Sequence, residues 1–264
     1  MAAGPRRVAV VGACGRMGEC VRAALAGEPG LALAAALEAP GHPRLGAVLE
    51  GGVRLEGDPK AALARCDVAI DFALPAATLA TLRVAAEAGV AYVTGTTGFD
   101  AVEKGEIASL ARRIPVIHAA NFSVAVNVLV WLARSAARLL GPGFDAEVLE
   151  LHHAGKRDAP SGTAIALAEA IAAARGGSLA DHLVLERAGA IGARPAQAIA
   201  VQSLRGGDCP GEHTVLFLGQ GERLELVHRA ASRDHFARGA VRAAVWLAGR
   251  PPGLYPFEQV LGLA

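Results

Sequence analysis

The sequence predicts an α/β protein in which a parallel sheet with covering helices is followed by an α+β layer. Up to about residue 140, short apolar runs alternate with helical patterns. Beyond that point, strand-like runs follow one another across glycine-rich turns. The chain has 264 residues, of which 53% are hydrophobic, and this is ample for a sizeable core. The length fits one large domain or two smaller ones.

The parallel layer begins with a strand at residues 8–11 that enters a glycine turn, and a helical pattern follows at residues 16–26. Further strands, with alanine-rich helical stretches between the later ones, are predicted at residues 31–37, 66–72, 90–94 and 115–119. A long helix at residues 124–140 closes at Gly141-Pro142-Gly143. Strands that alternate with helices imply a parallel sheet with right-handed crossovers.

The second layer has a different rhythm, because its strands follow one another directly. Its strands are predicted at residues 146–153, 197–204, 213–219 and 222–229, and a helix at residues 163–175 follows the first of them. A last helix at residues 236–249 is expected to return to the first domain.

The charge balance and the cysteines exclude several classes of protein. Lys and Arg number 26 against 25 Asp and Glu, so no overall field attracts nucleic acid or an anionic membrane. Apolar stretches such as residues 32–37 are far shorter than the roughly 20 residues of a membrane-spanning helix. The four cysteines are scattered, with no C-x-x-C pair and no export signal, so neither disulfides nor a zinc ribbon are expected. We expect a cytoplasmic protein that binds neither nucleic acid nor membrane.

A glycine loop lies between the first predicted strand and its helix. It reads Gly12-Ala13-Cys14-Gly15-Arg16-Met17-Gly18, with the spacing G-x-x-G-x-x-G. Such a turn lets the backbone approach a pyrophosphate at the helix N-terminus, although a tight turn alone would also need glycines. Glu38 lies 20 residues beyond Gly18, at the end of the second predicted strand, where a carboxylate can accept hydrogen bonds from ribose hydroxyls. Together they predict a dinucleotide site.

Two further loops follow predicted strands at their carboxyl ends, the edge where ligands bind in an open parallel sheet. One is Gly95-Thr96-Thr97-Gly98-Phe99 and the other is Ala119-Ala120-Asn121-Phe122-Ser123. Thr, Asn and Ser also form turns and helix caps, so a structural role and a binding role both remain open.

The segment from Glu150 to Ala164 concentrates titratable groups at a strand end. His152 and Lys156 are placed to donate protons and to stabilise negative charge, and Ser161-Gly162-Thr163 opens a helix that can bind an anion such as a carboxylate. A solvated basic turn with an ordinary N-cap is the alternative. Because His152 and His153 are adjacent on a strand, they point to opposite faces, and we expect no metal.

In combination, these motifs closely resemble the dihydrodipicolinate reductase family of bacterial and plant lysine biosynthesis. The pattern H-H-x-x-K-x-D-x-P-S-G-T-A, which begins at His152, is present without substitution. Asp71-Phe72, Gly211-Glu212-His213-Thr214 and residues 232–247 extend the match, so that it covers nearly the whole chain in order.

The resemblance implies a Rossmann-type cofactor domain at residues 1–123 and 234–264, and a substrate domain at residues 124–233. It further implies a homotetramer assembled through the substrate-domain sheets. The implied reaction is the NAD(P)H-dependent reduction of a small cyclic imine dicarboxylate to tetrahydrodipicolinate, on the route to diaminopimelate and lysine.

The resemblance also implies the roles of single residues. His152 would be a proton donor or acceptor, and Lys156 a second proton donor. Substrate would bind to His153, Gly162 and Thr163. The residues expected to contact the nicotinamide cofactor are Gly12, Ala13, Cys14, Gly15, Arg16, Met17, Glu38, Gly95, Thr96, Thr97, Ala119, Ala120, Asn121 and Phe122.

The pair Glu38-Ala39 bears on the choice of dinucleotide. A carboxylate repels the 2′-phosphate of NADPH, and family members that favour NADPH tend to carry a basic residue at the position of Ala39. Because Arg16 can offset the repulsion, we expect use of both NADH and NADPH, with NADH equal or better. The alternatives are an L-aspartate dehydrogenase-like oxidoreductase and a non-catalytic NAD(P)H-binding redox sensor. His152 and Lys156 argue against the sensor.

Overall fold

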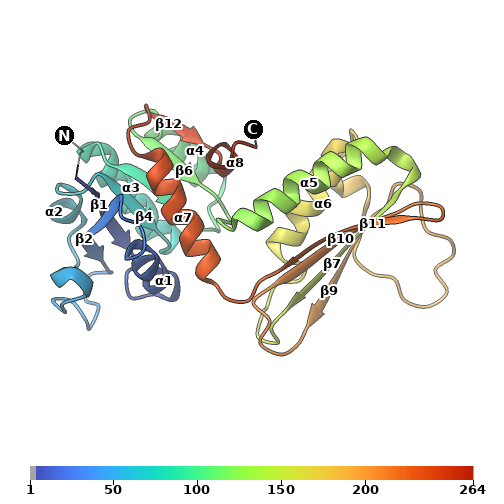
Figure 1. The fold of residues 1–264 in the computed structure, drawn as a ribbon, viewed down its shortest axis with the longest axis horizontal. Coiled ribbons are helices and arrows are strands. Elements are labelled where there is room, and N and C mark those ends of the chain that lie inside the picture. The colour runs from blue at the N-terminus through green and yellow to red at the C-terminus, as the bar shows by residue number, and fades with distance from the viewer. Residues whose placement is uncertain (1–3, 264) are drawn as a thin grey trace. The chain divides into compact units, whose positions relative to one another are not determined.

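The computed structural model describes residues 4–263 of the chain. The chain divides into two compact units, of which the first comprises Met1–Val124 and Arg233–Ala264 and the second Ala125–Ser232. Figure 1 shows that the C-terminal segment, in red, belongs with the blue N-terminal part. Each unit is described by itself.

Within residues 4–263, the first unit contains a seven-stranded sheet in the order β12-β6-β5-β4-β1-β2-β3. All of its strand pairs are parallel, which confirms the predicted α/β class. Its strands are β1 (Arg6–Val11), β2 (Leu31–Leu37), β3 (Leu55–Glu56), β4 (Val68–Asp71), β5 (Ala91–Thr94), β6 (Pro115–His118) and β12 (Gly253–Tyr255). The edge strands β3 and β12 are only two and three residues long, too short for a pattern of alternation to reveal them.

Two layers of helices cover this sheet because successive side chains of a strand point to opposite faces. Val8 and Val10 belong to one apolar cluster, whereas Ala9 and Val11 belong to another. The first cluster packs against α1 (Arg16–Leu25), α7 (Asp234–Leu247) and α8 (Phe257–Leu261). The helices of the second layer are α2 (Pro59–Leu63), α3 (Pro75–Ala88) and α4 (Ala101–Leu110).

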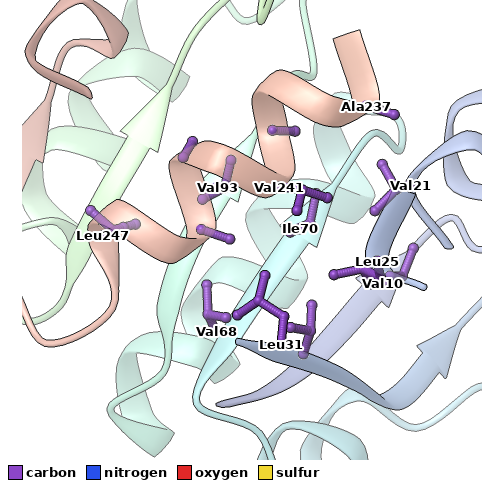
Figure 2. Close-up of a cluster of buried hydrophobic side chains, with 14 of the residues drawn as sticks. Val10, Val21, Leu25, Leu31, Val68, Ile70, Val93, Ala237, Val241 and Leu247 are labelled. Atoms are coloured by element: carbon purple, nitrogen blue, oxygen red, sulfur yellow. The ribbon is translucent and has the colours of Figure 1, made fainter. Parts of the chain in front are cut away.

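Helix α7 closes the first unit from the far end of the sequence, as the pattern at residues 236–249 predicts. Figure 2 shows its side chains, among them Val241, directed toward Ile70 and Val93 of the sheet. The helix ends at Leu247, two residues before Gly249, whose positive φ of 85° does not continue a helix. Gly239 of α7 lies so close to the carbonyl oxygen of Phe122 that an added Cβ would be 1.8 Å from it.

The second unit is an α+β layer with a five-stranded mixed sheet, again counted within the described residues, in the order β11-β10-β7-β9-β8. Strands β7 and β9 run parallel, and β10 is antiparallel to both β7 and β11. One face packs on two helices through Leu129, Val148 and Leu167. The elements are α5 (Val124–Leu140), β7 (Asp145–His152), α6 (Gly162–Ala174), β8 (Leu183–Val184), β9 (Ile199–Arg205), β10 (Glu212–Leu218) and β11 (Arg223–Arg229).

Several predicted boundaries shift for local reasons. The strand predicted at residues 66–72 begins only at Val68, because the backbone N–H of Cys66 donates to the carbonyl of Leu63 and completes the turn after α2. The strand predicted at residues 197–204 begins at Ile199, because Gln197 has a φ of 60° in the left-handed region.

Helix α5 corrects the expectation that every apolar segment is far shorter than a membrane-spanning helix. Together, α5 and the 3-10 turn Gly141–Gly143 form a helical segment of 20 residues, Val124–Gly143, with a mean hydropathy of 1.4. By length and composition this segment could cross a membrane, and 22% of its most apolar stretch is buried inside the protein. The core helix of a globular protein passes the same test. Its buried residues Val126, Leu129, Ala133 and Ala137 recur every three or four positions, as in a helix that packs one face on a core.

The surroundings of a buried glycine on α7 and an exposed glycine on α4 predict opposite effects on stability when each is replaced by alanine. We expect Gly239→Ala to lower the free energy of unfolding by roughly 1–3 kcal/mol or more, because the new methyl group overlaps the Phe122 carbonyl. The control is Gly105→Ala on the exposed face of α4, where an added Cβ meets nothing within 4 Å. It should stabilise by about 0.5–1 kcal/mol through helix propensity. Urea unfolding of both variants checks this, and equal midpoints would contradict the packing argument.

Candidate active site

The carboxyl edge of the first unit's sheet brings the glycine loop and Glu38 together. The strand order reverses between β1 and β4, which is where a crevice forms in an open α/β sheet. Gly12 has a φ of 70°, and a Cβ on Gly18 would lie 2.1 Å from the carbonyl oxygen of Gly12. The loop therefore needs glycine at both positions. Glu38 Oε1 accepts a hydrogen bond of 2.7 Å from the backbone N–H of Cys14, so the carboxylate lies directly against the loop.

A buried carboxyl group supports the next loop along this edge. Asp71, at the end of β4, accepts hydrogen bonds of 2.7 Å from the backbone N–H of Ala73 and from the hydroxyl of Tyr92. Burial raises the pKa of Asp71. In the sequence Asp71 is only part of a motif, and the structure shows that it fixes the turn that carries Phe72.

The loop after β5 packs directly on that turn. The hydroxyl of Thr96 lies 2.8 Å from that of Thr78 and 3.2 Å from the carbonyl oxygen of Ala73. A Cβ on Gly95 would overlap the ring of Phe72 at 2.1 Å. Of the predicted residues here, Gly95 thus makes room for an aromatic ring, Thr96 is buried and Thr97 is exposed.

A pocket of about 260 Å³ opens at this edge, entirely within the first unit. Six of the residues predicted for the cofactor line it, namely Arg16, Met17, Gly95, Ala120, Asn121 and Phe122. Three others do so without having been predicted for the site, namely Phe72, Arg233 and Phe236. Arg233 and Phe236 come from the start of the C-terminal segment, and no local pattern could show that they reach a loop more than a hundred residues earlier.

The second unit holds its titratable groups around one buried carboxylate. Glu150 of β7 is only 1% exposed. It accepts a hydrogen bond of 2.5 Å from Nδ1 of His152, two of 2.8 Å from the guanidinium of Arg205, and one of 3.0 Å from the backbone N–H of Ser161. One side chain therefore joins β7, β9 and the start of α6.

These contacts set the charge of each group. Burial alone would raise the pKa of Glu150, but hydrogen bonds from Arg205 and other donors outweigh it and lower the pKa to about 2. Burial lowers the pKa of His152. Glu150 opposes this shift, whereas the positive charges of Lys156 and Arg205 add to it. The cluster thus pairs an ionised Glu150 with a neutral His152 at pH 7.

A second histidine stands behind the first. His213 of β10 is buried, its ring centroid lies 5.2 Å from that of His152, and Nε2 lies 3.1 Å from the hydroxyl of Ser161. Burial lowers its pKa to about 4. His213 is therefore a neutral partner that holds Ser161 and packs against His152.

Lys156 and the first turn of α6 supply the positive side of the site. The Lys156 ammonium lies 2.8 Å from a carboxylate oxygen of Asp158, which is itself 61% exposed. Ser161 caps α6, with its hydroxyl accepting from the N–H of Ala164 at 3.2 Å. Gly162 and Thr163 then occupy the first turn, where backbone N–H groups point out of the helix end. His153, just after β7, is half-buried.

Glu150, Arg205 and His213 carry much of this arrangement, and none was given a role from the sequence. Glu150 was detectable, because two residues along a strand place it on the same face as His152. Arg205 and His213 were not, since their proximity depends on the pairing of β9 and β10 with β7, where His152 aligns with Arg205 and Glu150 with His213.

The fold and these two groups of residues define a class. The first unit has a parallel sheet with a glycine loop and an acidic residue after its second strand. The second unit presents His152 and Lys156 beside a helix N-terminus. This combination is typical of a nicotinamide-dependent oxidoreductase. Two family models match the chain, "Dihydrodipicolinate reductase, N-terminus" over residues 6–122 and "Dihydrodipicolinate reductase, C-terminus" over residues 125–261. The chain belongs to the dihydrodipicolinate reductase family.

Individual relatives of known name are similar to this chain along nearly its whole length. A 4-hydroxy-tetrahydrodipicolinate reductase of Anaeromyxobacter dehalogenans is 49% identical, with 97% of this chain and 98% of the relative covered. A 4-hydroxy-tetrahydrodipicolinate reductase of Thiobacillus denitrificans is 46% identical, with 97% of this chain and 98% of the relative covered. Among solved structures, the dipicolinate-bound dihydrodipicolinate reductase of Paenisporosarcina sp. TG-14 has a TM-score of 0.79 and 26% identity, covering 96% of this chain and 97% of that one.

More distant structures share the fold alone. An aspartate semialdehyde dehydrogenase of Vibrio cholerae has a TM-score of 0.59 and 15% identity, with 92% of this chain and 98% of that one covered. Because both units match the reductase family, the comparisons favour a reductase over the aspartate dehydrogenase-like and sensor alternatives. The protein is an NAD(P)H-dependent oxidoreductase that acts on a small molecule.

Proposed function

We propose that the protein reduces the cyclic imine dicarboxylate formed from 4-hydroxy-tetrahydrodipicolinate, on the route to diaminopimelate and lysine. The observation that carries this proposal is the buried Glu150–His152 pair of the second unit, with Lys156 and the first turn of α6 beside it. Proton-transfer groups next to an anion site are what the reduction of an imine dicarboxylate requires. The names of the relatives support the same reaction.

The substrate class follows from the charges of this site. A dicarboxylate carries close to two negative charges, which the Lys156 ammonium and the N–H groups of Gly162 and Thr163 would offset. His153 would add a further donor. The relative from Paenisporosarcina has dipicolinate bound, a planar dicarboxylate, and this supports the assignment.

The residues of the first unit fit a nicotinamide dinucleotide. The positive φ of Gly12 and the lack of space for a Cβ at Gly18 keep this loop free of side chains at both positions, as a loop that approaches a pyrophosphate requires. When bound, the dinucleotide supplies the hydride that reduces the ring. Glu38 would accept hydrogen bonds from the adenosine ribose. The remaining contacts are assigned to Ala13, Cys14, Gly15, Arg16, Met17, Gly95, Thr96, Thr97, Ala119, Ala120, Asn121 and Phe122.

The charge states divide the proton transfers between two side chains. Nδ1 of neutral His152 donates to Glu150, so Nε2 carries a lone pair and accepts a proton. The Lys156 ammonium is the donor. Loss of water from the hydroxylated precursor needs a base for a ring proton and an acid for the leaving hydroxyl, and reduction then needs a proton for the enamine. His152 would accept the ring proton while Lys156 protonates the leaving hydroxyl, and protonated His152 would then return its proton to the enamine.

We expect His152→Ala and Lys156→Ala each to lose about 100-fold or more in turnover while retaining cofactor binding, the usual scale for a positioned acid or charge stabiliser. Arg157→Ala is the matched control, because Arg157 lies on the same loop but is exposed. It should turn over at the parent rate. Steady-state kcat with saturating substrate, and NADH fluorescence for binding, measure these effects.

The assay that decides the function follows the absorbance of reduced cofactor when the unstable substrate is generated in a coupled reaction. Loss of absorbance only in the presence of this substrate is the expected result. Oxidation of cofactor with oxaloacetate and ammonia instead would favour an aspartate dehydrogenase. Binding of cofactor without turnover would favour a sensor. A parent rate in either alanine variant would show that its catalytic assignment is wrong.

For the dinucleotide, we propose that NADH is used as well as NADPH or better, because Glu38 repels a 2′-phosphate and Ala39 supplies no compensating charge. A charge-assisted contact from Arg16 would restore roughly 1.5–3 kcal/mol to NADPH. Ala39→Arg should therefore improve kcat/KM for NADPH, and Arg16→Ala should weaken NADPH more than NADH. Measuring kcat/KM for both at fixed ionic strength checks this. A parent preference for NADPH above tenfold would overturn it.

We also propose that the chain forms a homotetramer through the face of the second sheet that lies opposite α5 and α6. Leu149, Leu204 and Val227 are 36%, 52% and 44% exposed, and strand alternation places them opposite the face that packs on α5 and α6. Leu149 and Val227 both align with Thr214, which lies between them on β10, and Leu204 aligns with Leu151, so these residues form a partly apolar patch across the sheet. A second copy, with the same patch, can cover it.

Light scattering of the full chain should give about four times 26.8 kDa. Leu204→Glu places a charge in the patch and should shift the mass to smaller species. Val102→Glu, at an 80% exposed position of α4 in the first unit, is the control and should leave the mass unchanged. A monomeric parent chain would contradict the tetramer without affecting the proposed reaction.

A further inference from the structure

Three side chains with metal-binding atoms meet beside the glycine loop. The ligand atoms of Cys14, Glu38 and His42 all lie within 4.8 Å of one another, and the three residues are half-buried. Cys14 comes from the glycine loop, Glu38 from the end of β2 and His42 from the turn that follows. The proposed reaction uses Glu38 and the backbone of Cys14, but neither the thiol of Cys14 nor the imidazole of His42.

The combination of ligand atoms in this cluster favours Zn²⁺ over Mg²⁺ and Ca²⁺. Thiolate sulfur, imidazole nitrogen and carboxylate oxygen are the ligands of Zn²⁺, which forms bonds of roughly 2.0–2.3 Å and accepts three protein ligands with water in the fourth position. Mg²⁺ and Ca²⁺ prefer oxygen ligands alone. Bonds of this length bring ligand atoms to within roughly 3–4 Å of one another, so closure of the present cluster requires movements of about 1 Å.

The surroundings permit this closure. His42 lies in a turn held by backbone hydrogen bonds to Ala39 and Leu45, so its ring can rotate without moving a strand. Nδ1 of His42 accepts a long 3.3 Å hydrogen bond from the N–H of Arg44, and metal binding through either ring nitrogen gives up this one weak contact. The nearby Arg44 guanidinium lies 3.9 Å from the carboxylate of Glu19, which partly offsets its charge.

We propose that Cys14, Glu38 and His42 form a Zn²⁺ site whose occupation excludes the dinucleotide. The exclusion rests on the proposed function, because Glu38 cannot coordinate a metal and accept ribose hydrogen bonds with the same oxygens. A metal bound to the Cys14 sulfur also lies against the loop assigned to the pyrophosphate. The metal is an inhibitor in this arrangement and takes no part in the reduction.

Metal binding is tested first, without cofactor or substrate. Cobalt(II), a spectroscopic substitute for zinc, should give a thiolate-to-metal charge-transfer band on titration into the reduced full chain, and excess Zn²⁺ should remove the band. Cys14→Ser should abolish it. His42→Ala should weaken Co²⁺ and Zn²⁺ binding by at least roughly tenfold, since even the loss of a residue that only orients a ligand costs 10–100-fold. The matched control Cys20→Ser, half-buried on α1 but outside the cluster, should keep the band.

Competition with the dinucleotide is tested next. Zn²⁺ should raise the KM for NADH with kcat unchanged, and it should raise the Kd of NADH measured by fluorescence. His42→Ala should keep its NADH activity without metal and lose the inhibition. An absent band in the parent chain, a band that persists in Cys14→Ser, or inhibition that is unchanged in His42→Ala would overturn the proposal. A band in a chain that lacks reductase activity would leave the metal site standing and contradict the proposed function instead.

Discussion

The second unit depends on a single buried carboxylate. Taking Glu150 out of water while ionised is costly unless donors replace the lost solvent, and four hydrogen bonds from Arg205, Ser161 and His152 do so. Each donor belongs to a different part of the unit, so the requirement to satisfy one charge fixes the register of β9 on β7, the start of α6 and the tautomer of His152. The fold of the second unit and the tautomer of His152 thus depend on the same carboxylate.

In the first unit, the loops at the carboxyl edge of the sheet are held in place above a closely packed core. Asp71 and Thr96 anchor the turns after β4 and β5 through partly buried hydrogen bonds to the backbone of Ala73. The aromatic rings of Phe72, Phe122 and Phe257 then pack edge to face behind these turns, with centroids 5.9 and 5.0 Å apart. Loops supported in this way can present their backbone to a ligand without collapsing into the sheet.

The sequence predicted what depends on neighbours along the chain. Alternation and helical periodicity located β1, β2, α5 and the four longer strands of the second unit, and the glycine loop was placed correctly between β1 and α1. Periodicity could not reveal β3 and β12, which are too short. It also could not show that Arg205 pairs with Glu150 or that Arg233 lines the first unit's pocket, since such contacts arise from strand pairing and from the return of the C-terminal segment.

The abundance of alanine and glycine, which the composition alone leaves unexplained, has a physical consequence in α7. Ala237, Ala240, Ala243 and Ala244 are fully buried, and Gly239 touches the Phe122 carbonyl. Small side chains let the axis of α7 approach α1 and the sheet closely, at the expense of apolar area per residue. In the glycine loop, Gly18 likewise leaves room for the backbone, because a Cβ there would lie 2.1 Å from the carbonyl oxygen of Gly12. Close packing and an accessible backbone are therefore two uses of the same small residues.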